Sequence, residues 1–212
     1  MTEQRMDFGG WIKEAFQLYK ENFVLLFVAS LLALLLGVFT CGILYGPMLA
    51  GVTLILLRLL RNAPQKPNVG DVFIGFEYFL PAFLFCLVWG VVSSLLSYLA
   101  PGIGAVAAWC VSPLVMFTIS LIVDRKMDFG PAMVQSYNMA KTQYGPLLLL
   151  CLVSISLFVV GALVCGIGVF FTAPLMLAIP VVAYHHLSPS LEERQAVEEK
   201  SRIEAEEPPP EA

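Results

Sequence analysis

The side chains that could bind a metal ion or attack a substrate are few in this chain of 212 residues, and their spacing matches no catalytic arrangement. His185 and His186 are adjacent, so on a helix they point roughly 100° apart and cannot share a metal ion as residues four apart can. The five cysteines include no Cys-x-x-Cys pair and are typical of small apolar packing residues. The sequence therefore predicts no catalytic residue, no metal site and no cofactor.

Two of the cysteines stand in matching places. Cys41 precedes Gly42, and Cys165 precedes Gly166, in two short turns between apolar segments. One interpretation is a disulfide between them in an oxidising compartment, and the other is a pair of free thiols. The sequence leaves both open.

Basic side chains are a further group with a chemical role, since Lys and Arg at a membrane surface attract anionic lipid headgroups. We expect such contacts from the cations near the ends of the apolar segments, which are Lys13, Lys20, Arg58, Arg61, Lys66, Arg125, Lys126 and Lys141. Contacts of this kind orient a protein in the membrane and need not form a regulatory site.

The composition indicates which elements hold these residues. Hydrophobic residues make up 58% of the chain and charged residues 13%, whereas soluble domains average about 45–50% and about 25%. About 20 apolar residues are needed to cross a hydrocarbon core roughly 30 Å thick. Six such runs predict an all-α polytopic membrane protein with six transmembrane helices in three hairpins, at about 23–40, 43–60, 79–100, 104–123, 144–164 and 168–187.

The distribution of charge predicts the orientation of these helices. The three turns inside the hairpins carry no charge, and all 12 Lys and Arg residues lie on the opposite side. Positive charge on short loops marks the cytoplasmic face, so both termini are expected there. The last segment, 188–212, holds eight Glu, and we expect it to be an acidic, disordered cytoplasmic tail.

An internal repeat divides the chain into similar units. Residues 5–9 (RMDFG) recur as residues 126–130 (KMDFG), and an amphipathic stretch follows each copy. We expect interfacial helices at about 7–22, 71–78 and 128–143, lying in the headgroup plane with their apolar sides toward the acyl chains. The alternative is that these stretches are the cytoplasmic ends of long spans.

A proline follows each hairpin turn inside the next apolar segment, at Pro47, Pro113 and Pro174. Proline removes a helical hydrogen bond and bends or breaks a helix, so these three residues are predicted to kink the bundle. A gating role is the alternative, because broken helices form the substrate sites of many transporters.

Several short motifs, taken in order, match the pattern of a known family. After an amphipathic start they are Gly46-Pro47, Leu56-Leu57-Arg58, residues 68–76 (NVGDVFIGF), Asp124-Arg125 and Tyr144-Gly145-Pro146-Leu147. Over about residues 7–187 the chain resembles a large bacterial family of uncharacterised integral membrane proteins, related to the membrane domain found on some glycerophosphodiester phosphodiesterases. The resemblance implies six spans in a bacterial cytoplasmic (inner) membrane and no assigned activity. The catalytic residues of the phosphodiesterases have no counterpart here.

The sequence thus predicts a non-enzymatic integral membrane protein. We expect it to act through contacts with the lipid bilayer and with a protein, either a partner bound through the acidic tail or a second copy of the chain. The alternative is a small-solute or lipid transporter that uses the proline-broken helices. Nucleic acid is not an expected partner, because the tail at 188–212 accounts for the acidic charge with a net −5 and residues 1–187 carry only +1.

Overall fold

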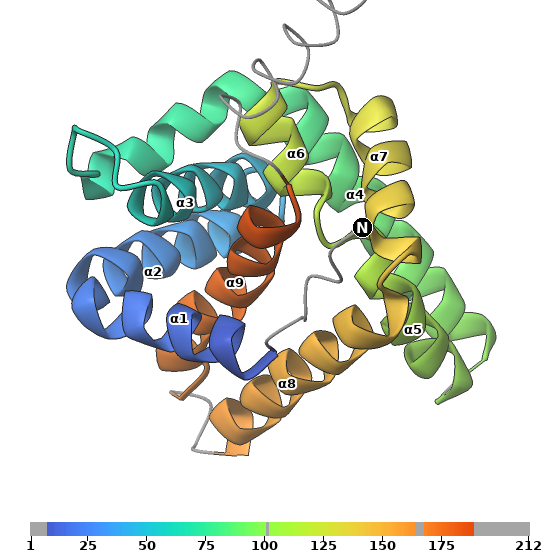
Figure 1. Cartoon of the computed structure of the whole chain (residues 1–212). Helices are drawn as coiled ribbons and strands as arrows, with labels where there is room; N and C mark the ends of the chain where they lie inside the picture. The colour runs from blue at the N-terminus through green and yellow to red at the C-terminus, as the bar shows by residue number, and fades with distance from the viewer. Residues whose placement is uncertain (1–7, 101, 164–167, 189–212) are drawn as a thin grey trace, which may run out of the picture.

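The computed structural model describes residues 8–100, 102–163 and 168–188, and these fold into helices with no strand. The elements are α1 (Phe8–Glu21), α2 (Phe23–Phe39), α3 (Tyr45–Leu60), η1 (Val69–Tyr78), α4 (Phe79–Leu99), α5 (Ile103–Val115), α6 (Thr118–Arg125), α7 (Phe129–Lys141), α8 (Tyr144–Leu163) and α9 (Gly168–Leu187). Figure 1 shows α9 near the centre, with α1, α2 and α3 on one side of it and α4, α5 and α7 on the other. The prediction of an all-α protein is confirmed.

The apolar helices agree with the predicted segments in position but not all in length. Four helical segments are long and apolar enough to cross a membrane, or five if α1 and α2 form one broken span. Helices α2 and α3 have only 17 and 16 residues, fewer than the roughly 20 that a typical hydrocarbon core requires. The described chain therefore has several long apolar helices, as a multi-pass membrane protein would, and the count of six stays a prediction.

Two predicted segments take a different form in the structure. The segment at 104–123 is divided into α5 and α6, with the break at Met116 and Phe117, three residues after Pro113. The segment at 71–78, expected to be a short interfacial α-helix, is part of the ten-residue 3₁₀ helix η1, which begins at Val69. A 3₁₀ helix of this length is uncommon, so its close contacts must hold it in place.

Two glycines bring η1 directly against α3. A Cβ atom on Gly51 would lie 1.9 Å from the carbonyl oxygen of Val72, and one on Gly75 would lie 2.1 Å from the carbonyl oxygen of Pro47. No side chain fits at either position. The absence of side chains allows the two backbones to touch, as small residues do between membrane helices.

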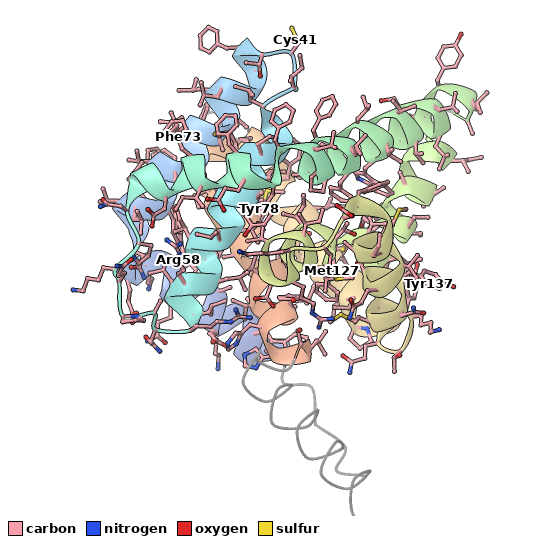
Figure 2. The ribbon with its side chains drawn as sticks, turned by 90° about the horizontal axis from the view of Figure 1, so that it is seen from above. Cys41, Arg58, Phe73, Tyr78, Met127 and Tyr137 are labelled. Carbon is pink, nitrogen blue, oxygen red and sulfur yellow. The ribbon has the colours of Figure 1, made fainter. Side chains whose placement is uncertain are left out.

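The hairpin of α4 and α5 has the opposite character, because it projects from the rest of the molecule. Figures 1 and 2 show it extending away from α2 and α3 with no element along its outer side. Only 6% of the most apolar stretch of the run Val69–Leu99 is buried, against 44% in α9. The outer half of this hairpin is therefore apolar surface without a partner among the described residues.

Candidate functional site

The polar side chains gather on one side of the molecule. Figure 2 shows nitrogen and oxygen atoms concentrated along its lower edge, on the side opposite Cys41. Asp124, at the end of α6, has a side chain that is only 4% exposed. Its carboxylate accepts a hydrogen bond from Arg61 Nη1 at 2.5 Å and another from the Tyr184 hydroxyl at 2.7 Å.

Asp124 thereby joins the ends of three helices. Arg61 follows α3, Asp124 belongs to α6 and Tyr184 lies in the last turn of α9. The hydrogen bond from Arg61 to Asp124 raises the pKa of the guanidinium above its ordinary value. Both carboxylate oxygens of Asp124 are occupied by donors, as buried polar atoms normally are. The arrangement is a structural tie between the end of α3, α6 and α9.

The other two arginines of the predicted headgroup set also bind protein groups. Arg58 Nη1 donates to the carboxylate of Asp71 at 2.9 Å, and the same carboxylate accepts the backbone N–H of Asn68 at 3.2 Å. Arg125 Nη2 donates to the hydroxyl of Ser188 at 2.9 Å. The planar guanidinium suits such fixed contacts better than an ammonium group does.

The lysines of the predicted set are different, because their side chains lie at the surface. Lys20 Nζ lies 4.6 Å from the ring centroid of Phe16, and Lys141 Nζ lies 5.8 Å from that of Tyr137. Both contacts are cation–π contacts within one helix and leave the ammonium group accessible. The exposed lysines are Lys13, Lys20, Lys66, Lys126 and Lys141. The predicted set thus separates into arginines that tie helices together and lysines that face outward.

Helix α1 is attached to α9 by both stacking and hydrogen bonding. The ring of Trp11 stacks on that of His186 with centroids 5.8 Å apart, and His186 Nε2 lies 2.6 Å from the carboxylate of Glu14. The Tyr19 hydroxyl donates to the backbone carbonyl of Phe171 at 2.9 Å. The histidine pair therefore lies at a helix interface. Among the described residues there is no group of three metal-ligating side chains.

The three prolines occupy different places in their helices. Pro47 is the third residue of α3, where a missing N–H leaves no helical bond unmade, so it begins a helix and does not interrupt one. Pro113 and Pro174 lie inside α5 and α9. The carbonyl of Trp109, four residues before Pro113, accepts the Ser112 hydroxyl at 2.7 Å instead.

A second side chain donates a hydrogen bond to a backbone carbonyl group next to the break between α5 and α6. The hydroxyl of Ser136 in α7 donates to the carbonyl of Leu114 at 2.9 Å, and that carbonyl precedes the two non-helical residues between α5 and α6. Ser136 is buried. The repeat helix α7 therefore stabilises the broken helix directly.

Two cavities complete the candidate sites. A cavity of about 270 Å³ between α3, α4, α5, α6, α8 and α9 is lined by apolar side chains and by Thr53, Ser112, Ser120 and Ser154. A larger pocket of about 640 Å³ lies at the polar side, between α1 and the end of α3. Its polar residues include Glu21 and Asn22, which no sequence pattern singled out.

The predictions on the cysteines and the tail fall partly outside the described residues. Cys41 is an exposed free cysteine in the turn after α2, and Cys165, its suggested disulfide partner, lies outside the described residues. The tail from residue 189 onward lies outside them as well.

The fold and the site together define a class of protein. The chain is all-helical, it has several long apolar helices, and its described polar side chains lie mainly on one side. These features are compatible with a multi-pass membrane protein. No family model, no curated protein and no solved structure matches the chain.

Proposed function

We propose that this chain is a non-enzymatic, six-span protein of the bacterial cytoplasmic membrane, with both termini in the cytoplasm. In this proposal it acts through contacts with lipid and with a protein, which is a second copy of the chain or a partner bound by the acidic tail. Helices α2 and α3 count as spans, because bilayers thin locally around short helices at modest cost.

The observation that carries the proposal is the outer half of the α4–α5 hairpin. Its exposed large apolar side chains are Leu87, Val88, Val91, Val92, Leu95, Tyr98, Leu99, Ile103 and Val106. An apolar patch of this extent on a protein in water marks an interaction surface or a site of aggregation. Inside a bilayer the same surface is in its natural solvent and is available to another membrane helix.

The orientation can be tested with the native cysteine of the first turn. Cys41 is exposed, so a membrane-impermeant maleimide should label it in intact cells of a Cys165→Ser variant. Lys126→Cys in a Cys41→Ser, Cys165→Ser background should react only after lysis, because it lies on the basic side. Labelling of both positions, or of neither, in intact cells would contradict the proposed topology.

The mode of action can be tested with a photo-crosslinking residue at Leu95. Irradiated membranes should give lipid adducts or a crosslinked dimer, and the same residue at Ala82, which is completely buried, should give neither. Absence of any adduct at Leu95 would remove the observation on which the proposal stands.

The cavity of about 270 Å³ favours a second candidate function, a small-solute or lipid transporter. Polar residues that line a cavity in a membrane protein can bind a polar solute, and Pro180, which lies inside helix α9, is among the lining residues. In liposomes, transport through this cavity should fall in Pro113→Ala and Pro174→Ala. Pro47→Ala is the matched control, because Pro47 begins α3 and should leave transport unchanged. Absence of flux for every solute and labelled lipid offered would reject this candidate.

A further inference from the structure

The pocket at the polar side exists because α1 turns sharply away from α2. The two helices meet at 92°, and the bend at Asn22 holds α1 apart from the end of α3. One wall comes from α1 and the start of α2, with Glu14, Gln17, Glu21, Asn22 and Leu25. The other comes from the end of α3 and the loop after it, with Arg58, Leu59, Asn62 and Lys66. Its volume of about 640 Å³ is in the usual range for a small ligand, about 300–1,000 Å³.

Two of the four charged residues that line this pocket have a partner in the protein. Glu14 is paired with His186 at 2.6 Å, and Arg58 with Asp71 at 2.9 Å. Glu21 and Lys66 form no salt bridge among the described residues. Glu21 accepts a hydrogen bond from Gln17 Nε2 at 2.9 Å, which leaves its negative charge in place.

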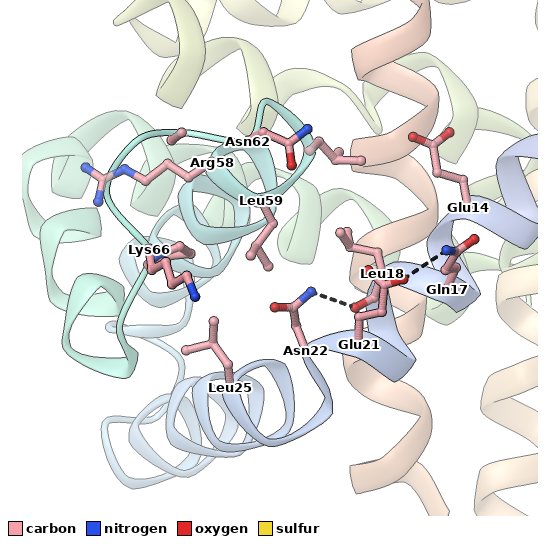
Figure 3. Close-up of a pocket in the computed structure, with 13 residues that line it drawn as sticks. Glu14, Gln17, Leu18, Glu21, Asn22, Leu25, Arg58, Leu59, Asn62 and Lys66 are labelled. Atoms are coloured by element: carbon pink, nitrogen blue, oxygen red, sulfur yellow. Dashed lines mark hydrogen bonds between the residues drawn. The ribbon is translucent and has the colours of Figure 1, made fainter.

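The two remaining charges lie on opposite walls. Figure 3 shows Lys66 on the loop with its ammonium group turned toward Asn22 and Leu25, and Glu21 on α1 on the far side of the pocket. Arg58 points away from both. A ligand that carries a negative group near Lys66 and a positive group near Glu21 would satisfy both charges at once.

We infer that this pocket binds the headgroup of a phospholipid that carries a phosphate and a primary ammonium, as in phosphatidylethanolamine. The phosphate contacts Lys66, and the ammonium contacts the carboxylate of Glu21. The leucines of the lining receive the apolar part of the lipid. The inference rests on the proposed function and on the expectation that the segment at about 7–22, which contains α1, lies at the level of the headgroups.

The lining also discriminates between headgroups. An anionic headgroup without an amine would place its phosphate in the pocket and leave Glu21 facing an excess of negative charge. A quaternary ammonium cannot donate a hydrogen bond, and proteins bind it through aromatic rings. None of the described residues that line this pocket is aromatic. Phosphatidylethanolamine should therefore bind better than either phosphatidylglycerol or phosphatidylcholine.

The test is native mass spectrometry of the full chain in detergent, with equal amounts of these three lipids carrying identical acyl chains. Phosphatidylethanolamine should be retained about fivefold more than either competitor, as expected for one partly exposed ion pair. Glu21→Gln should remove the preference over phosphatidylcholine, and Lys66→Gln should weaken all three lipids. Glu77→Gln is the matched control for Glu21→Gln, since Glu77 of η1 is also an exposed glutamate but lies outside the pocket, and it should leave the preference unchanged.

A soluble competitor distinguishes a lipid ligand from a free solute with the same polar groups. Glycerophosphoethanolamine, added at the same concentration as the lipid, should not displace the lipid, because this competitor lacks the acyl chains. Displacement would overturn the inference of a lipid ligand. Equal retention of all three lipids, or a preference that survives Glu21→Gln, would also overturn it while leaving the proposed function intact. The proposed function itself is tested by two separate measurements, the maleimide labelling and the crosslinking at Leu95.

Discussion

Helix α3 and the outer half of the α4–α5 hairpin have similar apolar compositions but opposite surroundings. Along α3, η1 approaches so closely that a Cβ on Gly51 would overlap a backbone carbonyl. In the hairpin, a Cβ on Gly90 would find no atom within 4 Å. Gly90 of α4 therefore has no packing role, whereas Gly104 of α5 packs only within the hairpin, where a Cβ would lie 1.9 Å from the carbonyl oxygen of Leu96. The contrast separates the part of the molecule that is held by its own contacts from the part that depends on lipid or on another protein.

The largest expected effect comes from adding a methyl group on the packed side. Gly51→Ala and Gly75→Ala must separate two backbones, so each should lower the free energy of unfolding by about 3 kcal/mol, the upper range for overpacking. Gly90→Ala should be neutral or slightly stabilising, since alanine favours helix. Unfolding of the purified protein in mixed micelles measures all three, and equal effects would end the distinction between the two regions.

The next effect concerns the tie at Asp124. Asp124→Asn should cost about 2 kcal/mol, because it weakens a charge-assisted hydrogen bond in a mostly buried site. The control is Asp128→Asn, since Asp128 occupies the N-cap position of α7 without making a side-chain cap bond. It should change the unfolding free energy by less than about 0.5 kcal/mol. A large effect of Asp128→Asn would show that the charge matters more than the buried geometry.

A smaller effect is expected at the broken helix. Ser136→Ala leaves the Leu114 carbonyl without its hydroxyl donor and should cost about 1 kcal/mol. Ser156→Ala is the control, because Ser156 is exposed and bonds only to Leu152 of its own helix. If the two variants unfold alike, α7 does not stabilise the junction of α5 and α6.

The smallest effect on stability is expected in the hairpin. Leu95 is 52% exposed, so Leu95→Ala in micelles should change the unfolding free energy by less than about 0.5 kcal/mol. A loss above about 1 kcal/mol would mean that the hairpin packs on the rest of the chain in solution and would weaken the comparison.

The positions of the helices could be predicted where local signals mark them. The segments expected at 144–164 and 168–187 correspond to α8 and α9 within one residue, because a long uncharged run in the sequence marks each helix. Pro113 signals a disturbed helix, and α5 does end two residues later. Pro47 was expected to kink a helix that begins near residue 43. The turn before it is longer than the glycine pattern suggested, so α3 begins only at Tyr45 and Pro47 lies in its first turn.

The candidate site was harder to predict, because its contacts join distant positions. Arg61 and Tyr184 lie 63 and 60 residues from Asp124, and nothing in the sequence near Tyr184 indicates a polar partner. An acidic residue directly after a long uncharged run, as at Asp124, was the available signal. The pocket that contains Glu21 and Lys66 depends on the angle between α1 and α2, which amphipathic periodicity does not determine.

The tie at Asp124 has a consequence for the order of events during synthesis. A ribosome releases Arg61 and Asp124 well before Tyr184, so the carboxylate can meet the guanidinium while α9 has yet to be made. The phenol joins only when the last helix is inserted beside the others. Completion of the second hydrogen bond thus coincides with arrival of α9, and until then one oxygen of Asp124 lacks the partner that it has in the finished protein.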